Sequence, residues 1–159
     1  MLIPNQLKKY DLFLSVPMSF DGDKEYKKFR SQCLELIKLM EEQCGFKNVY
    51  FAGRDIESMK QFTPGQNAAL LDLQALKQSK RFMMYMPKKM SSSCTFEAGY
   101  ALRKNMPTVY LCHSSDDLPF LMKNLNDRFS RVNKYEAGDF DQLKYIIEQH
   151  GKCFYRKSV

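Results

Sequence analysis

The sequence has few of the residues that build metal sites. Its 159 residues include no tryptophan and only two histidines, His113 and His150, and its five cysteines form no CxxC pair. Structural and catalytic metal sites need His and Cys ligands at short, regular spacings. We therefore predict no metal centre. The cysteines also show no disulfide framework, so we expect reduced thiols, as is usual in the cytoplasm.

Long apolar runs are also absent. No segment approaches the roughly 20 apolar residues that a membrane-spanning helix needs, and residues 1–18 lack the basic region and apolar core of a secretion signal. We therefore expect no membrane association and a cytoplasmic location. A hydrophobic content of 44% over 159 residues is sufficient for one packed core. Residues 1–159 are accordingly expected to form a single domain.

Two common nucleotide-binding motifs are missing. No GxGxxG follows the first predicted strand, and GxxxxGK[ST] occurs nowhere. These glycine-rich loops bring backbone N–H groups to phosphates. Dinucleotide-dependent oxidoreductases and P-loop nucleotidases are therefore disfavoured, and no bound cofactor is predicted. A response-regulator receiver is disfavoured too, because the third predicted strand ends in Met86-Pro87-Lys88 instead of an acidic acceptor.

The formal net charge of +7 raises the possibility of a nucleic-acid partner. The aromatic residues of the predicted strands argue against it, because they fall inside apolar runs and are expected in the core rather than on a base-stacking surface. The basic residues are also spread along the chain, which favours a mildly basic, solvated surface. The basic pairs are Lys8-Lys9, Lys27-Lys28, Lys88-Lys89, Arg103-Lys104 and Arg156-Lys157.

Apolar segments of strand length alternate with amphipathic segments of helix length along the whole chain. This alternation predicts an α/β fold of three layers. Its central, mostly parallel five-stranded sheet would have Rossmann- or flavodoxin-like topology and helices on both faces. The expected strands are 10–17, 47–52, 81–86, 108–112 and 128–132, and the expected helices are 24–44, 66–79, 95–104, 118–126 and 140–150.

Two of these helices carry more detailed signals. Gly45 follows the first helix and is expected to end it as a C-terminal cap. The helix over 66–79 has an apolar stripe that is expected to face the core, and Asp72 is displaced from that stripe. The stripe consists of Ala69, Leu70, Leu73 and Leu76.

Right-handed crossovers place the loops after the parallel strands at one edge of the sheet. We therefore expect the loops over 16–23, 53–65 and 88–95 to converge there. Open α/β sheets bind their ligands at this edge. The loop over 53–65 is long for a compact domain, as binding loops often are.

Glu97 is the leading catalytic candidate, because it lies in the first turn of a helix that follows a hydroxyl-rich segment, Ser91 to Thr95. Hydroxyls and free N–H groups at a helix start suit an anionic or sugar-bearing ligand. Asp72, on the preceding helix, supplies a second acid. One carboxylate can attack an anomeric carbon while another holds a sugar hydroxyl or transfers a proton. Alternatively, Glu97 only stabilises the helix dipole and Asp72 is a solvated helix acid.

The order of these segments resembles the nucleoside 2-deoxyribosyltransferase superfamily, which includes deoxyribosyltransferases and nucleotide N-glycosidases. That family has an Asp-Leu pair on a helix, an apolar strand, a small hydroxyl- or glycine-rich loop and a Glu-x-Gly-x-Ala helix. The corresponding segments here are Asp72-Leu73, 81–87, 91–95 and Glu97-Ala98-Gly99-Tyr100-Ala101. The resemblance covers about two thirds of the chain, in order.

The resemblance implies cleavage of the N-glycosidic bond of a nucleotide or nucleoside, by hydrolysis or by transfer, with Glu97 as the nucleophile. It implies that Asp72 positions the sugar or protonates the leaving base. Ser91 and Ser93 would surround a 5′-phosphate, and Ser15 would line the same pocket. The resemblance further implies a homo-oligomer in which a neighbouring subunit completes each pocket.

The loop residues do not identify one substrate. Arg54 and Lys88-Lys89 could meet a phosphate, which favours a nucleotide over a nucleoside. The phosphate loop is serine-rich where relatives use glycine, so substrate specificity does not transfer. One alternative is a Toll/interleukin-1 receptor-like NAD hydrolase or cyclase in signalling or defence, which residues 96–111 resemble loosely. The other is a nucleotide-binding module without catalysis.

Overall fold

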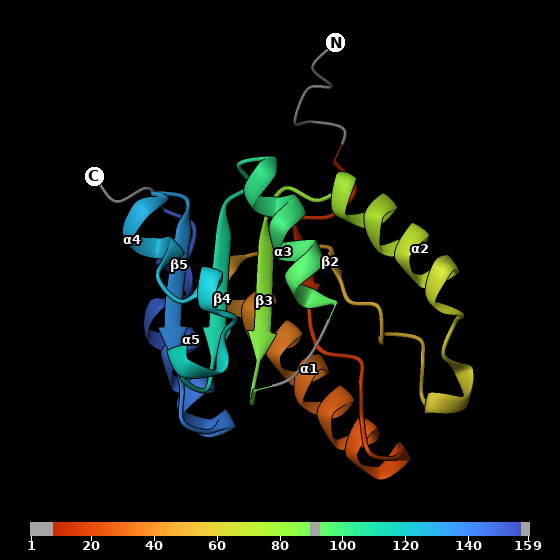
Figure 1. The fold of residues 1–159 in the computed structure, drawn as a ribbon. Helices are drawn as coiled ribbons and strands as arrows, with labels where there is room; N and C mark the ends of the chain where they lie inside the picture. Colours follow the sequence, from red (N-terminus) through yellow and green to blue (C-terminus); the bar gives the residue numbers. More distant parts are fainter. Residues whose placement is uncertain (1–7, 90–92, 157–159) are drawn as a thin grey trace.

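The computed structural model describes residues 8–89 and 93–156 and has one five-stranded sheet at its centre (Figure 1). All strand pairs are parallel, and the strand order is β2-β1-β3-β4-β5. This is the order of flavodoxin-like sheets. The predicted three-layer α/β fold is therefore confirmed. The strands are β1 (Leu12–Ser15), β2 (Val49–Tyr50), β3 (Phe82–Met86), β4 (Thr108–Cys112) and β5 (Val132–Glu136).

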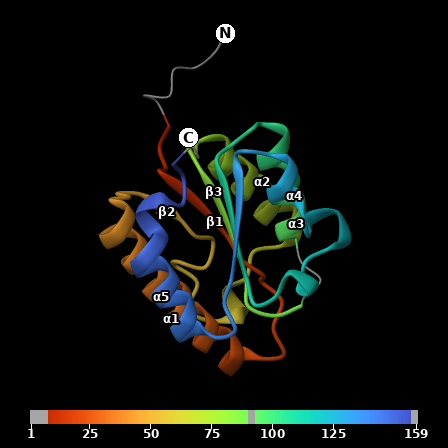
Figure 2. The ribbon, with the colours of Figure 1, turned by 90° about the vertical axis from the view of Figure 1, so that its left-hand side faces the viewer.

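Helices cover both faces of the sheet (Figure 2). One apolar cluster joins α1 (Asp23–Cys44) and α5 (Phe140–His150) to one face. A second cluster joins α2 (Gly65–Lys77) and α3 (Cys94–Arg103) to the other face, where α4 (Leu125–Arg128) also packs.

The sheet separates these clusters because consecutive side chains of a strand point to opposite faces. In β1, Leu12 and Leu14 belong to the α1/α5 cluster and Phe13 belongs to the α2/α3 cluster. In β3, Met83 and Met84 divide in the same way. All residues of β1, β3 and β4 are buried, as expected for parallel strands covered on both faces.

Several predicted boundaries are confirmed. The strand over 108–112 and the helix over 140–150 have the predicted bounds. Gly45 ends α1 in the left-handed conformation, with φ of 70°, and its N–H donates to the Glu41 carbonyl. Glycine adopts this conformation without the steric cost of a Cβ atom, so the predicted cap is confirmed.

The segment before β5 differs from the prediction. Instead of a helix over 118–126, the chain forms a short 3-10 helix, Phe120–Met122, followed by α4. The fifth strand begins at Val132, where 128–132 was predicted, because Thr108 of β4 pairs with Val132. β5 is an edge strand with three polar residues, so its composition did not indicate a strand; the pairing with β4 determines it.

The buried face of α2 also differs from the prediction. Ala75 and Leu76 are buried, whereas Leu70, assigned to the inward stripe, is 57% exposed. The beginning of α2 extends away from the sheet, and only its end lies against the core (Figure 1). The apolar stripe was therefore wrong for the first half of the helix.

None of the helices in the described ranges has both the length and the apolar character needed to cross a bilayer.

Candidate active site

The candidate site lies at the carboxyl edge of the sheet, above β1 and β3. The strand order reverses between these two strands, and such switch points are where open α/β sheets bind ligands. Met18, Phe62 and Ser93 come from the loops after β1, β2 and β3, and all three line one cavity there. The predicted convergence of these loops is thus confirmed for the described residues.

Two adjoining cavities occupy this position, and Ala68, Asp72 and Ser93 line both. The first cavity has a volume of about 190 Å³ and lies between α2 and the start of α3, with Glu97 in its wall. The second has a volume of about 250 Å³ and lies toward β2. Its other lining residues are mainly apolar or aromatic: Met18, Tyr50, Ala52, Ile56, Phe62, Thr63 and Leu71.

Glu97 is in the first turn of α3, and only 7% of its surface is exposed. Ser15, the last residue of β1, donates a hydrogen bond from Oγ to Glu97 Oε2. Buried carboxyl groups need such partners, because burial removes their hydration. The strand-to-helix hydrogen bond therefore fixes one carboxyl oxygen while the residue still borders a cavity.

Asp72 lies on α2, and its carboxyl group shares a hydrogen bond with that of Glu97 on α3. The Tyr50 hydroxyl donates to Asp72 Oδ1 at 2.9 Å. Tyr50, Asp72, Glu97 and Ser15 thus form one chain of hydrogen bonds that crosses from β2 over α2 and α3 to β1. The backbone of four separate elements holds the two carboxyl groups in contact.

This environment changes the proton affinity of both acids. Burial raises the pKa of Glu97 to about 8, and the nearby charge of Asp72 adds to this rise, whereas the Ser15 hydrogen bond opposes it. Burial also raises the pKa of Asp72, and its hydrogen bonds with Tyr50 and Glu97 oppose that rise. Burial keeps the pKa of Tyr50 above its ordinary value, so the phenol remains a donor.

Two carboxyl groups in contact cannot both ionise easily, so a single proton shared between them is the favoured state near neutral pH. Such a pair holds one negatively charged oxygen and one transferable proton side by side. The arrangement can therefore supply a nucleophile and an acid to a molecule in the adjoining cavity.

The other predicted site residues are distributed differently. Ser93 lines both cavities, and its side chain makes no capping hydrogen bond to α3. Ser15 lines neither cavity and is 1% exposed, so it contacts Glu97 and not the cavity space. Arg54 also lines neither cavity; it is exposed and donates to the Val49 carbonyl at 2.9 Å. Ser91 lies outside the described residues.

Tyr50 is the residue of this group that the sequence reasoning assigned to the core alone. Its ring does pack against Phe13 and Tyr10, but its hydroxyl reaches Asp72. A tyrosine near the end of an apolar strand gives no separate signal for such a contact, because the partner on α2 is distant in sequence.

No cluster of three or more His, Cys, Asp or Glu side chains suited to a metal ion occurs within residues 8–89 and 93–156. Lys88, predicted to meet a phosphate, forms an ion pair with Glu25 at 2.7 Å.

Comparison with known proteins adds one finding about the fold. No family model and no curated protein sequence matches the chain. Among solved structures, the CMP N-glycosidase BcmB of Clostridium botulinum superposes with a TM-score of 0.62. The alignment covers 87% of this chain and 98% of BcmB, at 17% sequence identity. The two proteins therefore have similar folds.

Proposed function

We propose that this protein cleaves the N-glycosidic bond of a nucleotide, releasing the free base. The observation that carries the proposal is the hydrogen-bonded Glu97–Asp72 pair in the wall of a cavity at the switch point of the sheet. The similar fold of a CMP N-glycosidase supports the same reaction class. The family resemblance in the sequence, at Asp72-Leu73 and Glu97 to Ala101, supports it independently of the coordinates.

The proposed reaction uses the shared proton of the pair. In the form of the pair in which Asp72 holds the shared proton, the Glu97 carboxylate attacks C1′ of the sugar. The electron pair of the C1′–N bond leaves with the base, which takes the proton from Asp72. Water then attacks C1′ of the glycosyl-enzyme and gives its proton to Asp72. This second step breaks the bond to Glu97 and restores the singly protonated pair.

The cavities suggest how the substrate would be oriented. The apolar and aromatic walls of the larger cavity suit a base, and its volume of about 250 Å³ is slightly below the usual range of ligand pockets. Ser93 and the start of α3 suit a 5′-phosphate, because its hydroxyl is not used in capping and the helix dipole favours an anion there. A mononucleotide is therefore the preferred substrate class. A role for Ser91 in the same phosphate site remains a prediction.

The direct test is to incubate the purified protein with nucleoside monophosphates and measure free base by chromatography. We expect base release, and we expect Glu97→Gln to lower its rate by at least about 1000-fold, because the amide cannot attack C1′. Glu148→Gln, an exposed change on α5, is the matched control and should keep full activity. Full turnover by Glu97→Gln would remove Glu97 as the nucleophile.

Two further arms separate the remaining alternatives. Adding a second free base during turnover would give an exchanged nucleotide if the protein is a transferase, and only sugar phosphate if it is a hydrolase. NAD in place of a monophosphate would release nicotinamide if the protein is an NAD hydrolase. A thermal shift with a nucleotide that stays intact in every assay would mean a binding module instead of an enzyme.

A further inference from the structure

A different cavity lies at the opposite, amino-terminal edge of the sheet, formed by the residues that precede β3, β4 and β5. Its volume is about 290 Å³. We call it the basic cavity and define it by its five cationic residues. These are Lys8, Lys80, Arg81, Lys104 and Arg131.

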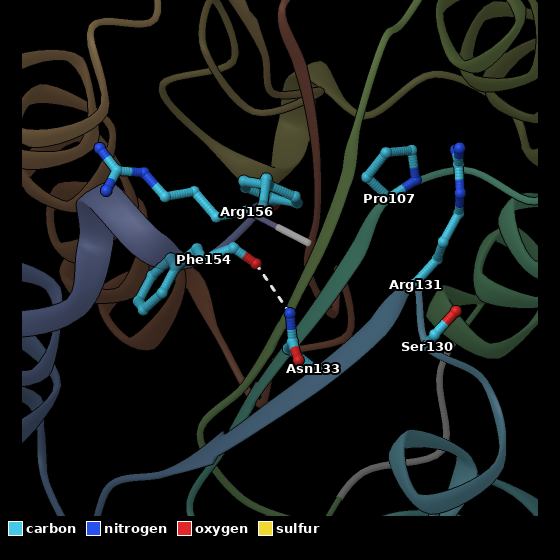
Figure 3. A pocket seen from close by; sticks show the side chains of 7 residues that line it. Pro107, Ser130, Arg131, Asn133, Phe154 and Arg156 are labelled. Atoms are coloured by element: carbon cyan, nitrogen blue, oxygen red, sulfur yellow. Dashed lines mark hydrogen bonds between the residues drawn. The ribbon is translucent and has the colours of Figure 1, made fainter. Parts of the chain in front are cut away.

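A smaller cavity of about 90 Å³ continues from it, and Pro107 and Arg131 line both. Figure 3 shows this smaller cavity, with Pro107 and Arg131 on one side and Phe154 and Arg156 on the other. The Asn133 side-chain amide donates to the Phe154 carbonyl at 2.9 Å, which joins two of its lining residues. The smaller cavity therefore adds the cationic side chain of Arg156 to this region.

The charges of the basic cavity are poorly neutralised. Among the residues described, no Asp or Glu lines either cavity. Asp11 forms an ion pair with Lys80 at 2.9 Å, and this is the one salt bridge that any of the five cations makes within the described ranges. The other four cations form no salt bridge with any Asp or Glu of residues 8–89 and 93–156.

Some of these cations are held in place by groups that carry no charge. Lys8 Nζ donates to the Lys77 carbonyl at 2.8 Å, and one guanidinium nitrogen of Arg131 donates to the Asn105 carbonyl at 3.0 Å. Such bonds fix the side chains and leave other donors of each group unused. The conformational entropy of these side chains is therefore already reduced in the free protein, so a ligand loses less binding free energy in ordering them.

Arg81 is fixed by aromatic rings. Its guanidinium carbon lies 5.4 Å from the centre of the Phe46 ring and 5.8 Å from that of Tyr155. Ring contacts orient a guanidinium without cancelling its charge, because the rings carry only a quadrupole. The bidentate edge of Arg81 therefore remains suited to a phosphate.

A helix dipole accounts for the position of only one of these cations. Lys104 follows the carboxyl end of α3, where cations are generally favoured. Arg81 and Arg131 immediately precede strands instead, so no helix end accounts for them. Their convergence with Lys8 and Lys104 on one hollow needs another explanation.

We propose that the basic cavity binds a small molecule with several phosphate groups, at a site separate from the Glu97–Asp72 pair. A compact ligand suits a concave volume of about 290 Å³. Sites for single-stranded nucleic acid usually include exposed aromatic rings that stack on the bases. Here Phe46 is buried and the Tyr155 hydroxyl is bonded to the Phe82 carbonyl, so these rings serve Arg81. This proposal does not depend on the glycosidase activity.

The test uses inorganic triphosphate as the probe and the full chain as the protein, at an ionic strength of about 0.15 M, where nonspecific attraction is largely screened. We expect saturable binding by calorimetry and a rise in melting temperature. The double variant Lys104→Glu/Arg131→Glu changes two exposed cations of the cavity and should weaken binding by at least about tenfold. Lys28→Glu/Lys38→Glu makes the same charge change at two exposed positions of α1 and should have little effect.

Three results would overturn the proposal. One is an absence of saturable binding. Another is equal weakening by both double variants, which would mean diffuse attraction to a basic surface. The third is tight binding of a single-stranded oligonucleotide with no binding of triphosphate, which would mean a nucleic-acid surface. Because triphosphate carries no glycosidic bond, none of these results bears on base release.

Discussion

At the scale of single residues, the site depends on Tyr50 as well as on the two acids. Its hydroxyl donates to Asp72 Oδ1, so it restrains the carboxyl group that interacts with Glu97. Tyr50 does not belong to the pair that would exchange the proton. It would act as a positioning residue.

Removing this hydroxyl should therefore slow catalysis without preventing binding. We expect Tyr50→Phe to lower kcat by about tenfold, since a hydrogen bond to a charged group contributes about 1.5–3 kcal/mol, and to leave KM nearly unchanged. The loss of a bond that opposes the rise in the pKa of Asp72 should also shift the falling limb of the pH profile to higher pH. Steady-state kinetics between pH 5 and 10 would measure both effects. An unchanged profile with an unchanged kcat would show that the hydroxyl is only structural.

The pH dependence of the wild-type protein follows from the shared proton. The pKa of Glu97 is raised to about 8, so the pair retains one proton below that pH and loses it above. Because the leaving base needs this proton, we expect kcat/KM to fall as pH rises through about 8. Asp72→Asn removes one member of the pair, and its residual activity should lack this falling limb. A rate that keeps increasing to pH 10 would contradict the proposed proton transfer.

Sequence reasoning identified part of this site. Glu97 and Asp72 could be selected from their positions on helices near one sheet edge, and the family resemblance selected Ser93. Arg54 was placed at the same edge by the same reasoning, yet its guanidinium turns back to the Val49 carbonyl. Loop position predicts which residues come near, but side-chain direction depends on local hydrogen bonds. Tyr50 was missed for that reason.

At the scale of helices and strands, two glycines have opposite expected effects on stability. Gly45 ends α1 at φ of 70°, whereas Gly99 lies within α3, where an added Cβ would meet no atom within 4 Å.

We expect Gly45→Ala to lower the free energy of unfolding by about 1 kcal/mol, because it forces a Cβ into the left-handed region. Gly99→Ala should raise it by about 0.5–1 kcal/mol, since alanine favours the helix. Urea denaturation of the two variants beside the wild type would measure both. A loss of stability in Gly99→Ala would show that α3 packs against something at that position.

The elements that were predicted correctly carry their own local signals. The strand over 108–112 is apolar apart from Thr108, and α5 begins at an Asp139 cap whose side chain accepts from the Gln142 N–H. β5 carries no such signal, because Asn133, Lys134 and Glu136 give it the composition of a loop. Its position depends on pairing with β4, which a single sequence does not display.

At the scale of the whole molecule, exposed apolar side chains gather near the candidate site. Leu70 and Leu71 on α2 are 57% and 52% exposed, and Phe96 on α3 is 62% exposed. Such groups often mark protein interfaces. The homo-oligomer expected from the family resemblance remains a prediction, and this is the surface that we would assign to it.

The prediction is tested by light scattering after size exclusion. We expect the wild-type protein to have at least twice the mass of the monomer, and Leu70→Lys to shift it toward the monomer by placing a charge in the interface. Tyr145→Lys, an equally exposed change on α5, should leave the mass unaltered. A monomeric wild-type protein at concentrations of tens of micromolar would refute the assignment.

The two outer strands limit how copies of this chain could join. β2 pairs for only two residues, and β5, the strand at the other border, carries Lys134 at its centre. A short border and a lysine are both devices that discourage strand-by-strand growth into fibrils. Growth of the sheet from one copy to the next is therefore disfavoured, and we expect contacts between copies to involve the helices, as at Leu70 and Phe96.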